Sequence, residues 1–149
     1  MQTQKLLERI AILLKVNLQG LLIESADPPE TAAYWRTEMA GGLADAKDAV
    51  AKAIAQEHQL EKQLGAARSS ADAWDGKVDA ALEAGDETRA RAALKRKMAY
   101  ECVGNELQNK LAHHRQVMAD MKASVSALQA KVIDLEGLRK PSRSGRKSL

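Results

Sequence analysis

The stretch WDGKVDAALEAGDETRARAALKRK, residues 74–97, decides the fold. Two runs of strong helix formers, rich in alanine and charged residues, flank a single break at Gly85 and Asp86. Glycine suits the left-handed residue after a helix end, and aspartate suits the N-cap of the next helix. Glu87 would then lie beside the positive end of the helix dipole. The stretch therefore predicts the tip of a helical hairpin near residues 84–87.

The regions on both sides of this break have the composition of long helices. No proline occurs between Glu30 and Lys140, and alanine, leucine and charged residues predominate. We expect rods over about 30–84 and 86–136, each roughly 75–85 Å long at about 1.5 Å per residue. Two rods of matched length should fold back on each other. The predicted fold is all-α: an N-terminal amphipathic helix, an antiparallel coiled-coil hairpin and a basic tail.

A heptad repeat marks the faces along which the two rods would pack. In the first rod it comprises Leu43, Val50, Glu57, Leu64, Ala71 and Val78, with Ala46, Ala53, Leu60, Ala67, Trp74 and Ala81. In the second it comprises Leu111, Met118, Val125 and Val132, with His114, Met121, Leu128 and Leu135. Before these, Leu94, Met98, Cys102 and Leu107 drift out of phase, which predicts a local change of winding. Gly41 and Gly42, two adjacent weak helix formers, are either tolerated in the coiled coil or mark a bending joint.

The N-terminal segment, residues 1–26, predicts one amphipathic helix that the Pro28-Pro29 pair ends. On a helical wheel large aliphatic residues fill a continuous half, interrupted only by Asn17. Two interpretations remain open: burial against the hairpin or another subunit, and insertion into a membrane interface. They are compatible if the helix switches between the two. The residues that would insert are Leu6, Ile10, Leu13, Leu14, Leu18, Leu21 and Leu22, with Lys5, Arg9 and Lys15 at lipid phosphates.

The last residues, 137–149, form a basic tail with five Arg or Lys and no acid. Such a tail is either a solvated extension without a function or a second, salt-sensitive contact with an anionic surface. It has no aromatic side chain for base stacking, so we expect nucleic acid to be an improbable partner. The single cysteine, Cys102, excludes an internal disulfide and fits a reducing compartment. The N-terminus lacks the pattern of a secretory signal.

No catalytic or cofactor-binding motif stands out. There is no phosphate-binding glycine loop, nucleophile elbow or paired-cysteine site. His113 and His114 are adjacent, so on a helix they point about 100° apart and are badly placed to share a metal. His114 and Cys102 are better explained as packed side chains of the coiled coil. We expect no enzyme activity, no cofactor and no metal site.

The hairpin tip resembles that of the PspA/IM-thirty family, the phage shock protein A-like branch of the bacterial ESCRT-III superfamily. The matching positions are Trp74, Lys77, Ala81-Leu82, Gly85, Glu87, Ala90-Arg91, Ala93-Leu94 and Arg96-Lys97. The N-terminal segment and the stretch AVAKAIAQEHQLEKQL are also similar to the family. The tip departs from the family pattern at residues 88–89, and the usual further helices after the hairpin are missing. We therefore expect a short member.

The resemblance implies a stress-response protein that is peripheral on the cytoplasmic face of the cell membrane and binds anionic phospholipid. It implies homo-oligomers of hairpins stacked side by side, which maintain or remodel membranes, or co-assembly with a longer paralogue. Contacts between hairpins would use tip residues, namely Trp74, Gly85, Asp86, Glu87, Arg91, Leu94, Arg96 and Lys97. The alternative hypothesis is a soluble coiled-coil adaptor that binds a protein partner, such as an enhancer-dependent transcription activator.

Overall fold

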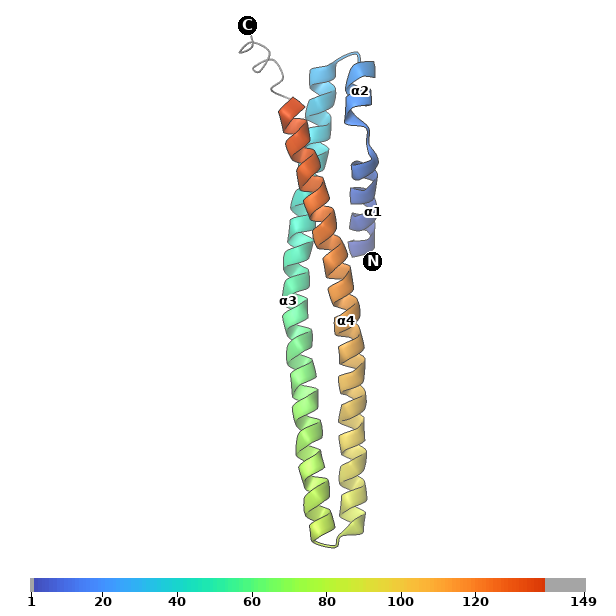
Figure 1. Ribbon diagram of the computed structural model, residues 1–149, viewed down its shortest axis with the longest axis vertical. Helices are drawn as coiled ribbons and strands as arrows, with labels where there is room; N and C mark the ends of the chain where they lie inside the picture. Colours follow the sequence, from blue (N-terminus) through green and yellow to red (C-terminus); the bar gives the residue numbers. More distant parts are fainter. Residues whose placement is uncertain (1, 139–149) are drawn as a thin grey trace. The chain divides into compact units, whose positions relative to one another are not determined.

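The structure is a computed structural model that describes residues 2–138, with side chains described for residues 4–137. All four elements in this range are α-helices: α1 (Gln2–Lys15), α2 (Leu18–Glu24), α3 (Pro28–Glu83) and α4 (Glu87–Leu138) (Figure 1). The predicted all-α class and helical hairpin, made by α3 and α4, are confirmed. Most of the basic tail lies outside the described residues.

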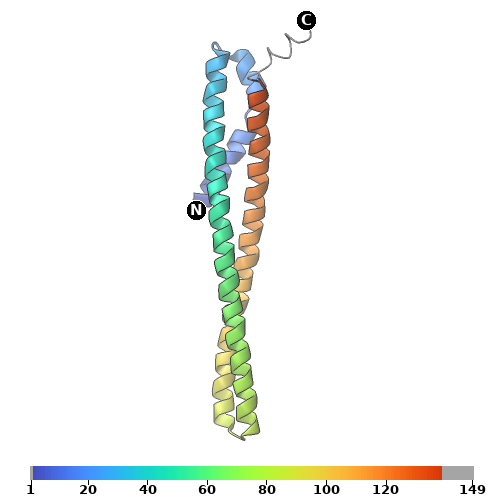
Figure 2. The same cartoon turned by 90° about the vertical axis from the view of Figure 1, so that its left-hand side faces the viewer.

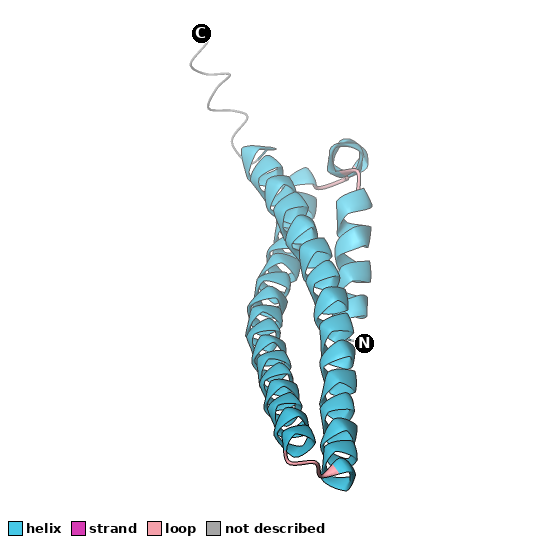
Figure 3. Ribbon diagram, turned by 60° about the horizontal axis from the view of Figure 1, so that its bottom comes forward, coloured by secondary structure: helices cyan, strands magenta, loops and turns pink. Residues whose placement is uncertain are grey.

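The turn between α3 and α4 has the geometry that its sequence predicts (Figure 3). Gly85 has a positive φ of 72°, in the left-handed region that favours glycine. The Asp86 amide donates to Ala81 O at 2.9 Å, and the Gly85 amide donates to Leu82 O at 3.1 Å. These two bonds form a Schellman motif, which satisfies carbonyls at the end of α3. Asp86 Oδ1 then accepts from the Arg89 amide at 3.1 Å and caps α4.

The start of α3 is also fixed by local chemistry. Pro28 is the first helical residue, a position where its missing N–H costs no hydrogen bond. The Asp27 carbonyl accepts the amide of Thr31 at 3.0 Å. Ser25 and Thr31 hydroxyls, 2.5 Å apart, tie the loop to the first turn of α3. The helix thus begins two residues before the predicted boundary at Glu30.

The heptad repeat continues without a phase change through the whole of α4. From Ala90 onward every seventh residue is buried or half-buried, and so is every seventh residue from Ala93. The two series are Ala90, Lys97, Gly104, Leu111, Met118, Val125 and Val132, and Ala93, Tyr100, Leu107, His114, Met121, Leu128 and Leu135. The predicted drift at Leu94, Met98 and Cys102 is wrong: all three are exposed. The repeat was hidden because small and charged residues occupy it at Ala90, Lys97 and Gly104.

The chain divides into two compact units, Met1–Lys52 with Met118–Leu149, and Ala53–Val117. In each unit the segments of α3 and α4 lie side by side, as two views show (Figures 1 and 2). The first unit also holds α1 and α2. Its core is a cluster of large side chains, made of Ile10, Leu13, Leu18, Met39, Ala46, Leu128 and Leu135.

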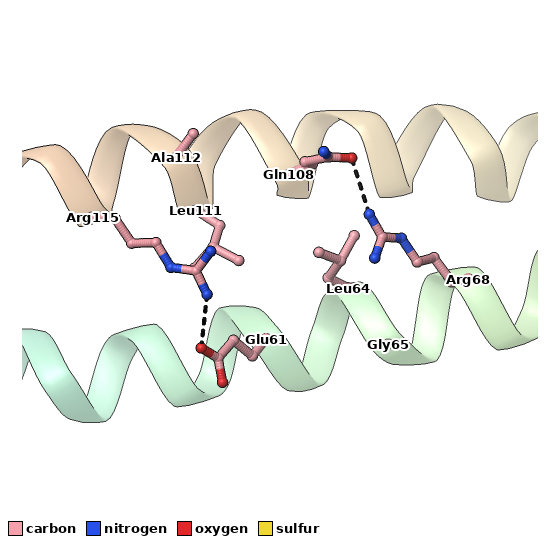
Figure 4. Close-up of a pocket in the computed structure, with 8 residues that line it drawn as sticks. All are labelled: Glu61, Leu64, Gly65, Arg68, Gln108, Leu111, Ala112 and Arg115. Carbon is pink, nitrogen blue, oxygen red and sulfur yellow. Dashed lines mark hydrogen bonds and ion pairs between the residues drawn. The ribbon is translucent and has the colours of Figure 1, made fainter.

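The second unit packs mainly small side chains, with Ala67, Ala71, Ala81, Ala90 and Ala93 among its buried residues. Since alanines bury little apolar area, polar contacts across the two helices add to the packing. Arg115 donates to Glu61 at 2.9 Å and Arg68 to Gln108 at 3.0 Å, beside Leu64 and Leu111 (Figure 4). His114 Nε2 lies 2.7 Å from Ala53 O, so this ring is a packed histidine that donates to a carbonyl.

Candidate membrane-binding site

The N-terminal segment packs its apolar side on the hairpin within the first unit. Ile10 and Leu13 are 1% and 4% exposed and join the core cluster with Met39 and Leu128. Burial against the hairpin, one of the two interpretations left open, is therefore what the structure shows. Among the residues predicted to insert, Leu18 is also buried, Leu6, Leu14 and Leu22 are half-buried, and Leu21 is exposed. The cations predicted to meet phosphates, Lys5, Arg9 and Lys15, are all exposed.

The segment is two helices and not the single helix that the wheel assumed. The backbone leaves the helical conformation at Val16 and Asn17, where Asn17 has φ −86° and ψ 89°. The Asn17 side chain accepts the Gly20 amide at 3.1 Å and so caps α2. Asparagine competes for backbone groups in this way, which makes it a good N-cap and a poor helix interior. The residue that interrupted the apolar half of the wheel is the residue that divides the helix.

Lys131 of α4 contacts the end of α1. Its ammonium donates to the carbonyls of Leu13 at 2.9 Å, Leu14 at 2.8 Å and Val16 at 2.6 Å. The last carbonyls of a helix lack partners within the helix and carry the negative end of its dipole, so a cation is well placed there. Burial lowers the pKa of Lys131, because desolvation disfavours the charged ammonium. Lys131 thus joins α4 to the end of α1 and the residue that follows it through three polar contacts.

Two further contacts hold α1 on α3. Gly42 is buried, and a Cβ atom there would lie 3.0 Å from Leu13 Cδ1. Arg9 Nη1 donates to Asp45 Oδ2 at 3.0 Å. α3 continues through Gly41 and Gly42 without a break, and the bending joint considered for this pair stays a prediction. The small residue at Gly42 permits the close approach of α1.

Sequence reasoning missed Lys131, Gly42 and Asp45 as parts of this site. Lys131 is a lysine beside the heptad position of Val132, and no local pattern shows which carbonyls it would reach. Asp45 is one of many acids on α3. Gly42 offered the single usable signal, since a glycine pair inside a long helix has either a conformational or a packing cause. Here the cause is packing.

The predicted tip residues are brought together in part. The Lys77 ammonium lies 4.0 Å from the Trp74 ring centroid, and the Arg96 guanidinium carbon lies 5.4 Å from it. Lys97 donates to Asp75 at 2.9 Å, and this hydrogen bond and charge raise the pKa of Lys97. Arg91 pairs with Glu87 of its own helix at 2.6 Å, while Leu94 is exposed.

No helix in the described part of the chain is long and apolar enough to cross a membrane. Within the same residues no group of three His, Cys, Asp or Glu side chains is arranged to hold a metal ion.

The fold and the site define a class of helical hairpin proteins that carry a short amphipathic N-terminal segment packed on the hairpin. The chain belongs to the PspA/IM30 family, which matches residues 5–140. It is 29% identical over 127 residues to the membrane-associated protein Vipp1 of Synechocystis, which covers 85% of this chain and 48% of that protein. It is 30% identical over 127 residues to Vipp1 of Nostoc punctiforme, covering 85% and 49%.

A further relative is the phage shock protein A homolog of Deinococcus radiodurans, 27% identical over 129 residues, which cover 87% of this chain and 58% of that protein. The chain thus spans about half the length of the curated relatives it matches. The resemblance found at the hairpin tip is confirmed, and so is its extent over most of the chain.

Proposed function

We propose that this chain is a non-enzymatic peripheral membrane protein that binds anionic phospholipid through α1 and α2. It would act on the cytoplasmic face of the cell membrane and assemble side by side through the hairpin to maintain or remodel the membrane. The observation that carries the proposal is the amphipathic segment 2–24, which is joined to the hairpin by a short loop and buries its aliphatic side on its own chain. The Vipp1 relatives are named membrane-associated proteins, and this supports the same proposal.

The charge of the segment suits an anionic surface. Lys5, Arg9 and Lys15 are exposed on the polar half of the segment, and Ile12 and Ile23 are two further exposed aliphatic side chains. An interfacial helix uses this combination, because aliphatic side chains enter the acyl boundary while cations stay at the headgroups. The docked position of α1 would also suit the soluble adaptor, but the membrane-associated relatives favour the lipid surface.

Exposed apolar side chains on α4 favour side-by-side assembly. Leu94, Met98 and Cys102 are spaced four residues apart, so they form one exposed stripe on the helix. These are the residues that sequence reasoning misplaced in the interior of the hairpin. An exposed apolar stripe outside the interior is a surface on which a second hairpin, of this chain or of a longer paralogue, could pack.

Co-sedimentation with vesicles tests the membrane proposal. The full chain and a chain without residues 1–24 are mixed with phosphatidylglycerol vesicles at moderate salt. We expect the full chain to pellet and the truncated chain to stay in solution. Equal pelleting of both would refute binding through α1 and α2. Phosphatidylcholine vesicles serve as the control for charge.

A further inference from the structure

The contact between Lys131 and α1 replaces helical hydrogen bonds that the segment lacks. In an α-helix each carbonyl accepts from the amide four residues later. The carbonyls of Leu13, Leu14 and Val16 would therefore accept from the amides of residues 17, 18 and 20. Because the chain leaves the helical conformation at Val16 and Asn17, these three carbonyls accept hydrogen bonds from the ammonium of Lys131 instead.

The amide side of the break is satisfied in the same manner. Asn17 Oδ1 takes the Gly20 amide, which an unbroken helix would direct to Val16 O. Two side chains, one from α4 and one from the segment itself, thus supply what a continuous helix would supply from its own backbone. Removing either one weakens what holds the break and the docked position, so a single helix over residues 2–24 can form once lipid covers its aliphatic side.

The aliphatic side chains of the segment, led by Ile10 and Leu13, leave water in both the docked and a lipid-bound state, since the hairpin covers them in one and acyl chains in the other. Release also uncovers the hairpin side chains that pack against them, Met39 and Leu128 among them, so burial alone favours the docked state. The polar contacts that add to the docked state include Lys131 with three carbonyls and Arg9 with Asp45.

We propose that Lys131 is a latch residue: its ammonium holds the segment broken and docked, and an anionic lipid surface releases it by offering phosphates to the same cations. On release the three carbonyls recover their backbone partners, and residues 2–24 join into one helix with a continuous aliphatic side. This inference rests on the proposed membrane function and names its regulation. The continuous wheel drawn from the sequence then describes the lipid-bound state, and the structure describes the docked one.

Hydrogen exchange without lipid tests the latch by itself. Lys131→Met keeps the apolar stem and removes the three donors. Lys122→Met, an exposed lysine of α4 in the same unit, is the matched control. We expect amide exchange across residues 4–22 to become at least about tenfold faster in Lys131→Met and to stay unchanged in Lys122→Met. Unchanged exchange in Lys131→Met would overturn the latch.

Residues 53–117 provide an internal reference in the same experiment, because they belong to the other unit. If exchange rises there as well, Lys131→Met has destabilised the whole chain, and Asn17→Ala becomes the deciding variant. It removes the competing cap without touching α4. Faster lipid-free exchange of residues 4–22 in Asn17→Ala supports the latch, and unchanged exchange overturns it.

Binding to phosphatidylglycerol vesicles tests the regulation. We expect Lys131→Met to reach half-saturation at a several-fold lower lipid concentration than the wild type, with Lys122→Met weaker than or equal to the wild type. In the bound wild type, the amides of residues 17–20 should become strongly protected, as a continuous helix requires. Failure of that protection, or equal binding of Lys131→Met and the wild type, would overturn the switch.

Truncation of residues 1–24 separates the two proposals. If the truncated chain binds vesicles as well as the full chain does, the membrane function of the segment fails, and the lipid-free exchange result alone decides whether Lys131 holds α1. If truncation abolishes binding and Lys131→Met changes neither exchange nor affinity, the function stands and the latch is refuted.

Discussion

Gly42 and Leu13 meet where α1 packs on α3, and a Cβ atom on Gly42 would fall 3.0 Å from Leu13 Cδ1. This separation is closer than ordinary van der Waals contact. At the neighbouring Gly41 the nearest atom, Arg9 Nη2, would lie 3.7 Å from a Cβ, which is an ordinary distance. A methyl group therefore fits at Gly41, whereas at Gly42 it would press on Leu13.

The pair gives a matched test. Gly41→Ala should raise the free energy of unfolding by up to about 1 kcal/mol, because alanine is the better helix former. Gly42→Ala gains the same helix propensity but pushes on Leu13, so we expect a smaller gain or a loss, with faster exchange of α1 amides. Urea unfolding and hydrogen exchange measure both. Equal gains in the free energy of unfolding with unchanged α1 exchange would show that the close approach of Gly42 and Leu13 does not limit the packing of α1.

The core of the first unit depends on Leu128, which is fully buried and packs beside Gly42. Leu128→Ala should lower the free energy of unfolding by about 2–5 kcal/mol, because it removes a buried side chain and leaves a cavity. Ile133→Ala, at a side chain 60% exposed on the same helix, should change it by less than about 0.5 kcal/mol. Chemical denaturation compares the two, and similar losses would contradict the packing of α4.

Much of the fold followed from local rules in the sequence. Gly85 and Asp86 predicted the tip because a left-handed residue and an N-cap are decided by a few neighbouring atoms. The heptad positions of α3 and of the second half of α4 were predicted because mainly apolar residues, alanines and larger aliphatics in α3, recur there every seven residues. The first half of α4 was mispredicted, because the interior is made of Ala90, Lys97 and Gly104, while the larger Leu94 and Met98 face outward.

The N-terminal segment was predicted in composition and not in its contacts. The wheel identified the apolar side correctly, since hydrophobic periodicity needs no knowledge of partners. It did not identify the break at Asn17, because some helices contain an asparagine in their interior and others begin at one, and the wheel does not distinguish the two cases. Lys131 and Asp45 were out of reach of sequence reasoning, because their roles depend on residues more than thirty positions away.

Exposure of Cys102 gives a direct test of the corrected heptad repeat. In the monomeric native protein its thiol should react with a maleimide at a rate close to that of the denatured chain, because it is exposed on its own chain. Gly104 is buried instead, and a Cβ there would have nothing within 4 Å. Gly104→Ala should therefore raise the free energy of unfolding by about 0.5–1 kcal/mol. Slow labelling of Cys102 in the monomer would contradict the continuous repeat and would support the phase change predicted from the sequence.

The Lys97–Asp75 pair predicts a dependence of stability on alkaline pH. Asp75 raises the pKa of Lys97 above its usual 10.5, so the folded state holds the proton more tightly than the unfolded state does. The stabilisation is fully present below pH 10.5 and is lost as the pH rises through the raised pKa. Wild type should be more stable than Asp75→Asn at neutral pH, and the gap should close at high pH. Asp79→Asn, an exposed acid on the same helix, should show no such closing gap.

Arg9, a cation that we predict to contact lipid phosphate, is paired with Asp45 of α3 at 3.0 Å in the docked segment. The same side chain can therefore hold α1 on the hairpin or bind lipid. Asp45→Asn removes this partner, and so it should raise affinity for phosphatidylglycerol vesicles about two- to threefold, as expected for an exposed pair worth less than about 1 kcal/mol. Asp48→Asn makes the same charge change on α3 but breaks only the pair with Lys52. Any gain in Asp48→Asn measures the general effect of removing one negative charge. The excess of Asp45→Asn over Asp48→Asn measures the release of Arg9, and it should shrink as salt screens both interactions.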